Sequence, residues 1–458
     1  MKIDVAKVKA PVLDHSGIPI MLTDETIEER KQKIIQLMQE AGYSSLVVYA
    51  DKEHGSNFEY LVGFIPRFEE ALLVFNIDGS AHLILGNENF NKIPYSRIKA
   101  EGQKCSLFSL PNQPMGDISE LKECLKKASL DQTEKVGLVG WKLIPDASGK
   151  SFDIPHFILT AIQSVVPDNQ LYNATDLLVG PVSGARTINN ANEIAHYEFG
   201  ASLASDGVLE SMNQLRIGAT ETEIGNYLSR AGQYNSVVTI SAFGPRFMGG
   251  NLYPTANELK KGDKVALTVG YRGGLSSRSG YAVSNRDELE ELDKNYFDEV
   301  VKPYFSAYHF WLQNIEIGKN GGAFYQEFEE FYPQATYGWE LCPGHLTADE
   351  EWLSSPFYKG STATVQSGML FQVDFIPSQE GHNGISAEST VALADEQLRK
   401  ELASSYPELW VRIEARRNYL AEELNIQLDE SVLPLASTLG YYRPFLLNKD
   451  AALVIKEG

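Results

Sequence analysis

The sequence predicts a two-domain protein in which an α/β domain precedes a larger α+β domain. Its length of 458 residues exceeds what one hydrophobic core usually supports. Helical and strand patterns alternate in the first part of the chain, whereas helices and antiparallel strands form separate groups in the second part. A small, turn-rich segment at 180–185 separates the two parts, so we expect domains at 1–182 and 183–458.

The first domain is expected to alternate helices with short buried strands. A helix begins after Thr23, which is followed by an acidic first turn, and Gly42 is placed to end it. Asp78-Gly79 separates two apolar runs, which is typical of a β-hairpin. A second helix is expected at about 118–129, and strands are expected at 45–49, 71–75, 81–85 and 136–139.

The second domain should begin with a long helix at 192–215. Gly218 ends this helix, and the capping-box pattern Thr220–Glu223 starts the next one. Strands are expected at 236–242, 264–271, 275–283, 369–376 and 385–393, and helical segments at 287–316 and 397–424.

Charge and cysteine usage narrow the class of protein. The net charge of -21, from 61 acidic and 40 basic residues, argues against nucleic acid or an anionic membrane as partner. Three scattered cysteines do not form a disulfide framework. No uncharged apolar run approaches the ~18 residues that span a bilayer, and residues 1–9 lack the apolar core of a secretory signal. We therefore expect a cytoplasmic protein.

Three side chains from separate segments form a candidate metal site: His345, Asp374 and Glu388. One imidazole and two carboxylates suit a single divalent cation such as Mn²⁺, Fe²⁺, Co²⁺ or Zn²⁺. Alternation along the two strands sets each acid opposite an apolar face, and an isolated interior carboxylate is costly. The acids therefore either share a cation or face water on the wet side of a sheet.

The strands 264–271 and 275–283 are expected to form a hairpin with Gly273-Gly274 as its turn. This register places Thr268 opposite Ser279, so weakly coordinating hydroxyls face each other. A shift of one residue would place Arg278 there instead, where its guanidinium could replace the charge of a metal ion. The alternative is that Arg278 is solvated or salt-bridged.

Other residues are candidates for a substrate pocket. His382 lies on the loop between the two acidic strands and is a candidate for contacting substrate or transferring a proton; a surface histidine is the alternative. Tyr337 and Trp339 are candidate pocket aromatics, although core packing explains them equally well.

Several short motifs follow one another in an informative order. They are Asn57–Phe64, Asn192–Ile194, Gly218–Glu221, Leu259–Asp263, Gly344-His345, Gly368-Met369 and Glu388. In this order they resemble the pita-bread metallopeptidase family, which includes aminopeptidase P, prolidase, methionine aminopeptidase and the metal-free relative creatinase. The resemblance covers nearly the whole chain. It implies a creatinase N-terminal-like domain, a pita-bread domain with a C-terminal extension, and a homodimer.

The resemblance also implies a degenerate metal site. It places the family's two aspartate ligands on Thr268 and Ser279 (or Arg278), its histidine on His345, and its two glutamates on Asp374 and Glu388. Two of five ligands are thus replaced, so we expect no metal or a single Mn, Zn, Co or Fe ion, and not a two-metal centre. The family's substrate-contacting histidine has no match in 250–254, and its proton-transferring histidine has none in 349–352.

Three functions stay open from the sequence. The first is a divergent Xaa-Pro aminopeptidase- or prolidase-like hydrolase, mononuclear or metal-free, that acts on a small amide or peptide-like compound. The second is a non-catalytic binding module that retains the cleft. The third is a conventional metal-dependent Xaa-Pro peptidase whose missing ligands come from residues in another register. The sequence names neither the substrate, nor the metal, nor the dimer interface.

Overall fold

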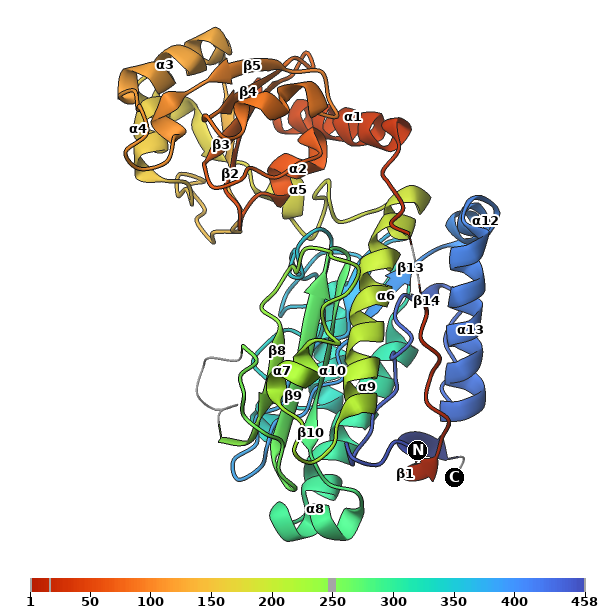
Figure 1. The fold of residues 1–458 in the computed structure, drawn as a ribbon. Helices are drawn as coiled ribbons and strands as arrows, with labels where there is room; N and C mark the ends of the chain where they lie inside the picture. Colours follow the sequence, from red (N-terminus) through yellow and green to blue (C-terminus); the bar gives the residue numbers. More distant parts are fainter. Residues whose placement is uncertain (1, 16–17, 246–252, 457–458) are drawn as a thin grey trace. The chain divides into compact units, whose positions relative to one another are not determined.

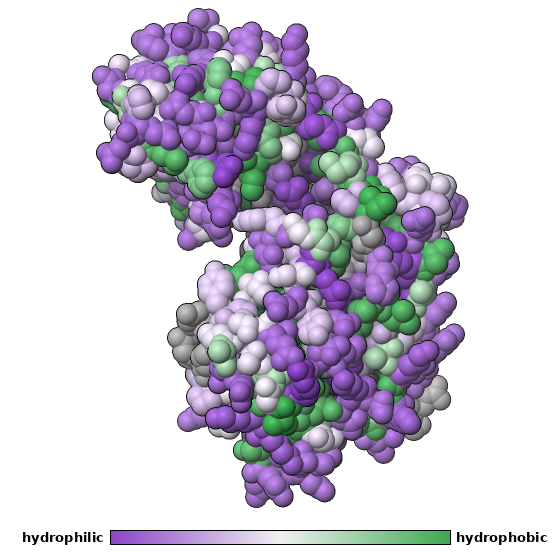
Figure 2. Space-filling model, in the orientation of Figure 1, coloured by the Kyte–Doolittle hydropathy of each residue, from purple (hydrophilic) through white to green (hydrophobic). Residues whose placement is uncertain are grey.

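The chain divides into two compact units, Leu22–Thr187 and Met1–Met21 together with Ile188–Gly458. The structure, a computed structural model, describes residues 2–15, 18–245 and 253–456. The first segment of the chain therefore groups with the C-terminal unit, and not with the N-terminal domain of residues 1–182 to which the sequence analysis assigned it. The face drawn in Figure 2 is mostly hydrophilic, in keeping with the high net charge.

The N-terminal unit is built on a six-stranded mixed sheet in the order β5-β4-β3-β2-β6-β7. Its strands are β2 Ser45–Ala50, β3 Ala71–Asn76, β4 Ala81–Leu85, β5 Glu101–Lys104, β6 Val136–Val139 and β7 Leu171–Asn173. Its helices are α1 Asp24–Ala41, α2 Ser56–Val62, α3 Ile118–Lys127, α4 His156–Gln163 and α5 Asp176–Val179. The expected elements are confirmed: the Thr23 hydroxyl caps α1, and Gly42 ends it with φ 73°.

The C-terminal unit contains three sheets, with orders β10-β9-β8, β11-β12-β13-β14 and β1-β15. Its strands are β1 Lys2–Lys7, β8 Ile240–Phe243, β9 Lys264–Tyr271, β10 Gly274–Tyr281, β11 His345–Leu346, β12 Leu370–Gln372, β13 Thr390–Leu393, β14 Val432–Pro434 and β15 Ala451–Lys456. Its α-helices are α6 Ala191–Gln214, α7 Glu221–Gly225, α8 Arg286–Leu292, α9 Lys302–Asn314, α10 Gly321–Phe331, α11 Gln334–Tyr337, α12 Glu396–Ser405 and α13 Pro407–Leu424, and Phe297–Val301 is a π-helix that leads into α9.

The long helix α6 packs along the β9–β10 hairpin (Figure 1). Its backbone comes very close to the turn, because a Cβ added at Gly200 would lie 1.8 Å from the carbonyl oxygen of Arg272. Gly273 has φ +98°, and a Cβ there would lie 2.2 Å from the carbonyl oxygen of Tyr197. The turn therefore needs glycine at 273 both for its backbone conformation and for its contact with α6.

The turn corrects the predicted register. Gly274 pairs with Tyr271, so Arg272 and Gly273 are the central residues of the turn rather than Gly273 and Gly274. Thr268 consequently lies opposite Ser277, whereas Ser279 lies opposite Ala266. Two adjacent glycines allow either turn, and the packing of α6, which the sequence does not show, selects between them.

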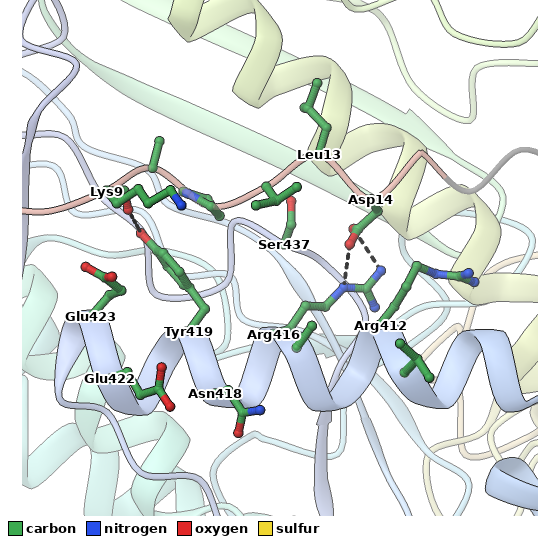
Figure 3. A pocket seen from close by; sticks show the side chains of 15 residues that line it. Lys9, Leu13, Asp14, Arg412, Arg416, Asn418, Tyr419, Glu422, Glu423 and Ser437 are labelled. Carbon is green, nitrogen blue, oxygen red and sulfur yellow. Dashed lines mark hydrogen bonds and ion pairs between the residues drawn. The ribbon is translucent and has the colours of Figure 1, made fainter.

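An extended segment that follows β1 lies beside α13 and is fixed there by buried ion pairs (Figure 3). Arg416 donates to Asp14 at 2.8 and 3.1 Å and to Glu198 of α6 at 2.6 Å. Arg412 also donates to Glu198, at 2.7 and 3.0 Å. The side chains of Arg416, Asp14 and Glu198 are all less than a tenth exposed. Arg416 therefore joins three segments that lie far apart in the sequence.

Among the helices of the described residues, none combines the length and apolar character needed to cross a membrane.

Replacing Arg416 by Met is expected to lower the free energy of unfolding by about 3–5 kcal/mol, because the substitution leaves the buried Asp14 carboxylate without its cation and Glu198 with only one of its two. Urea denaturation of the full chain measures the effect. The matched control is Lys456→Met, since Lys456 forms an exposed pair with Asp4; this change should cost less than about 1 kcal/mol. Equal small losses in the two variants would contradict the structural role of Arg416.

Candidate metal centre

His345, Asp374 and Glu388 are brought together by backbone pairing of three segments. His345 begins β11 and pairs with Gln372 of β12, and the preceding residue Gly344 donates its N–H to the Asp374 carbonyl at 2.9 Å. Val373 donates to the Ser389 carbonyl at 3.0 Å, which joins the Asp374 segment to the Glu388 segment. Asp374 follows β12 and Glu388 precedes β13, so both lie just outside the observed strands, which are shorter than the strands predicted at 369–376 and 385–393.

The acids are buried, which decides between the two interpretations of the sequence. Asp374 and Glu388 are each only 5% exposed and His345 is 0% exposed, so they are not acids on the wet side of a sheet. His345 Nε2 lies 3.7 Å from Asp374 Oδ2 and 4.0 Å from Glu388 Oε1. The sequence therefore identified three side chains that share one buried site.

A fourth member, Glu351, was missed by the sequence analysis. Its Oε1 lies 2.9 Å from His345 Nε2, and one potential ligand atom from each of the four residues lies within 4.8 Å of those of the others. The acidic run 349–351 was the available signal, but it was interpreted only as the place where a family histidine is missing. Next to it, Trp352 stacks on the His345 ring at a centroid distance of 4.0 Å.

The electrostatics of the cluster favour a bound positive charge. Burial opposes the charged form of His345, but attraction from Glu351 and Asp374 outweighs it and raises its pKa to about 10. Burial, together with repulsion from Asp374 and Glu351, raises the pKa of Glu388 well above its usual value. Without a cation, His345 therefore keeps its second ring proton at neutral pH, and the neutral form of the Glu388 carboxyl is favoured.

Three atoms of the cluster lack a hydrogen-bond partner within the described part of the chain. They are Asp374 Oδ1, Glu388 Oε1 and His345 Nε2, whose 2.9 Å contact with Glu351 Oε1 is an ion-pair distance without hydrogen-bond geometry. The other ring nitrogen, His345 Nδ1, lies 3.2 Å from the Leu346 carbonyl oxygen, which only accepts hydrogen bonds. Nδ1 therefore carries the ring proton, and Nε2 is left as the potential ligand atom. Buried, unpartnered and convergent ligand atoms fit a divalent cation.

The hairpin contributes hydroxyls rather than carboxylates. Thr268 Oγ1 and Ser277 Oγ lie 2.9 Å apart, and the Ser386 hydroxyl donates to Ser277 Oγ at 3.0 Å. The position opposite Thr268 is therefore Ser277, and the assignment of the second aspartate position to Ser279 or Arg278 is wrong in register. A hydroxyl, and not a carboxylate, therefore faces Thr268 across the hairpin.

Arg278 is buried and does not line a substrate pocket. Its guanidinium has five N–H donors, and all five are used. The acceptors are the carbonyls of Ser277, Glu388, Thr438 and Tyr441 and the hydroxyl of Ser389. Arg278 thus fixes the backbone that carries Glu388, and its predicted role as a substrate contact is wrong because none of its donors is left for a ligand.

The remaining pocket candidates are engaged elsewhere. His382 Nδ1 lies 2.6 Å from Asp293, and its Nε2 lies 3.2 Å from Glu299. Trp339 is 1% exposed and donates to the Tyr332 carbonyl at 2.8 Å, so it belongs to the core. Tyr337 stacks on the Tyr332 ring at 3.9 Å. The stretch 250–254, examined for a histidine, lies partly outside the described residues.

Comparison with solved structures gives the fold. An Xaa-Pro dipeptidase from Bacillus anthracis matches with a TM-score of 0.60 and 15% identity, over 81% of this chain and 96% of the dipeptidase. An X-Pro aminopeptidase from Thermotoga maritima matches with a TM-score of 0.60 and 18% identity, over 80% and 95% of the two chains. The chain has the pita-bread fold.

A third pita-bread structure, zinc-substituted E. coli aminopeptidase P in complex with product, matches with a TM-score of 0.54 and 16% identity, over 81% of this chain and 93% of that one. No protein-family model matches the sequence, and no curated protein does. Identities this low establish the pita-bread fold alone, which agrees with the fold class expected from the motifs.

Divalent-metal affinity is expected to rise with pH. To act as a ligand, His345 must lose a proton that its raised pKa retains at neutral pH, and the raised pKa of Glu388 likewise opposes the ionised form that binds a metal. Binding should therefore release protons, and each displaced proton should change the dissociation constant by about tenfold per pH unit below its pKa. Titration calorimetry with Mn²⁺ between pH 6 and pH 9, in buffers of different ionisation enthalpy, measures both effects. A metal affinity that is independent of pH would contradict the assignment of His345 and Glu388 as ligands. The control is His382→Gln, which should show the same pH dependence of affinity as the wild type.

Proposed function

We propose that the chain is a divergent hydrolase that uses one divalent cation, held by His345, Asp374 and Glu388, to act on a small amide or peptide-like substrate. The observation that carries the proposal is the convergence of three buried ligand atoms without hydrogen-bond partners in the described residues. The likeness to structures whose names include Xaa-Pro dipeptidase and aminopeptidase P supports this class of substrate.

A single ion fits the donor set. One imidazole nitrogen and two carboxylates suit Mn²⁺, Fe²⁺, Co²⁺ or Zn²⁺, and the two carboxylates neutralise the divalent charge. The ligands are held by hydrogen bonds around them: Gly344 fixes the backbone at Asp374, and Arg278 fixes the backbone at Glu388. Such prior positioning is what a metal site requires of its supporting residues.

A second ion does not fit. Thr268 and Ser277 offer neutral hydroxyls that already hydrogen-bond to each other and to Ser386. Neutral hydroxyls are poor ligands for these cations compared with carboxylates, and they leave the charge of a second ion uncompensated. The two-metal chemistry of a conventional peptidase is therefore not part of the proposal.

When bound, one cation supplies a Lewis acid that polarises a carbonyl and lowers the pKa of water. The residues of the chain shield and orient the ligand atoms. The burial of His345, Asp374 and Glu388 keeps bulk water from the ligand atoms, and the contact of His345 Nδ1 with the Leu346 carbonyl directs Nε2 inwards.

A second candidate is a non-catalytic binding module. The observation in its favour is the pair of hydroxyls of Thr268 and Ser277. A two-metal site would need carboxylates at these two positions, and the fold around them is intact without such a site. Assembly as a homodimer and a cytoplasmic location stay predictions of the sequence.

The purified protein is expected to bind one divalent ion per chain. His345→Ala should weaken binding at least about 100-fold, since loss of even an outer-sphere partner costs 10–100-fold. Elemental analysis and calorimetry measure the ion, and hydrolysis of proline-containing peptides and simple amides under added Mn²⁺ measures turnover. His382→Ala is the control and should bind normally.

The outcomes of this experiment separate the candidates. One ion with turnover supports the mononuclear hydrolase. One ion or none, without turnover but with stabilisation of the protein by peptide-like ligands, supports the binding module. Two ions with Xaa-Pro cleavage would overturn both in favour of a conventional peptidase.

The double variant Thr268→Asp/Ser277→Asp is expected to bind a second divalent ion. It restores two carboxylates on facing positions of the hairpin, beside the retained site. The metal content should rise from one to two ions per chain, and the variant should be stabilised by metal because its buried acids need a cation. The control Thr268→Asn/Ser277→Asn has similar side-chain size without charge and should keep one ion. Equal metal contents in the two variants would show that the hydroxyls are not what limits the site.

A further inference from the structure

Glu351 lies on a short loop whose shape is set by its backbone. Leu346 donates to the Ser354 carbonyl at 2.7 Å, and Leu353 donates to the Leu346 carbonyl at 2.9 Å, so the two ends of the loop are paired. The Glu350 carbonyl accepts from Ala348 at 3.1 Å inside the loop. These bonds return the chain towards His345 and place the Glu351 side chain on the metal site.

The position of Glu351 differs from that of the other three members of the cluster. Its side chain is 18% exposed, whereas those of His345, Asp374 and Glu388 are 0–7% exposed. It nevertheless makes the shortest of the three carboxylate contacts with His345 Nε2, at 2.9 Å, and this is the atom that the proposed ion would use. Glu351 is therefore the solvent-facing member of the cluster and lies within reach of the ion.

A simple ion pair between Glu351 and His345 does not account for the arrangement. An imidazolium carries one positive charge, but three carboxylates converge on it within 4.8 Å. A divalent cation carries two charges and binds all four ligand atoms at once, including the three that lack hydrogen-bond partners in the described residues.

We propose that Glu351 is a fourth metal ligand, supplied by the loop Leu346–Ser354. The inference rests on the proposed single-ion site and adds a ligand that the motif order does not contain. The third carboxylate adds negative charge to a site whose hairpin offers the neutral hydroxyls of Thr268 and Ser277 where the resemblance places aspartates. It also makes the donor set one nitrogen and three oxygens, which favours the harder ions such as Mn²⁺.

The fourth ligand has a consequence for the choice of metal. An ion that takes four ligands in a tetrahedron, as Zn²⁺ usually does in structural sites, has no open position when four protein groups bind it. An ion that accepts six oxygen or nitrogen ligands keeps positions for water and substrate. Glu351→Gln should thus reduce the affinity for both metals while opening a position on a four-coordinate ion.

The test compares Glu351→Gln with Glu350→Gln in the full chain. Both variants remove one negative charge from the same loop, but only Glu351 is within reach of His345. Calorimetric titration with Mn²⁺ and with Zn²⁺ should show at least about tenfold weaker binding for Glu351→Gln and less than about threefold for Glu350→Gln.

Trp352 supplies a local second measurement. It stacks on His345 and is 41% exposed, so an ion that binds both His345 and Glu351 should change its fluorescence. The metal-induced change should be smaller in Glu351→Gln than in the wild type, and it should be lost in Trp352→Phe.

The outcomes distinguish this inference from the proposed function. Wild-type binding of one ion, with unchanged affinity in Glu351→Gln, overturns the role of Glu351 and leaves the three-ligand site standing. Equal weakening in Glu351→Gln and Glu350→Gln overturns it too, because the effect then comes from net charge. Failure of the wild type to bind any ion overturns the single-ion site and this inference together.

Discussion

The convergence of three carboxylates, two of them buried, on one buried histidine is the constraint on which the site depends. Two unit charges 4 Å apart interact by about 4 kcal/mol at the effective dielectric typical of protein sites, so like charges at this distance need compensation. His345 supplies part of it by retaining a proton, and Glu388 by favouring its neutral form. A divalent cation satisfies the whole group. The backbone hydrogen bonds of Gly344 and Val373, and those that Arg278 makes to the backbone, hold the carboxylates close together despite their mutual repulsion.

The hairpin is stable with hydroxyls in place of charged side chains at its facing positions 268 and 277. The β9–β10 strands remain paired along their full length and packed on α6, although hydroxyls stand where the resemblance places acids. Thr268, Ser277 and Ser386 satisfy one another by hydrogen bonds, so they need no ion to be buried. The hairpin therefore needs no ion for its stability, whereas under the proposed function the cluster of His345, Asp374 and Glu388 is stabilised by one.

Local patterns predicted what local forces determine. The caps at Thr23 and Gly42, the length of α6 and the strands of the hairpin follow from propensity and periodicity, and the order of motifs identified His345, Asp374 and Glu388. The failures are non-local. The turn at Gly273 depends on the approach of Tyr197 from α6, and the burial of Arg278 depends on carbonyls near residues 438 and 441. Glu351 enters the site through the pairing of Leu346 with Ser354, which alternation patterns do not reveal.

The pairing of β1 with β15 has a consequence for protein synthesis. The first strand leaves the ribosome long before its partner, so the C-terminal unit cannot complete its fold until Ala451–Lys456 has been made. Meanwhile the unpaired edge of β1 is exposed to other nascent chains. The strand is short and carries Lys2, Asp4 and Lys7, and charges of this kind discourage edge-to-edge association. The charges of β1 thus limit association through its edge until β15 is available for pairing.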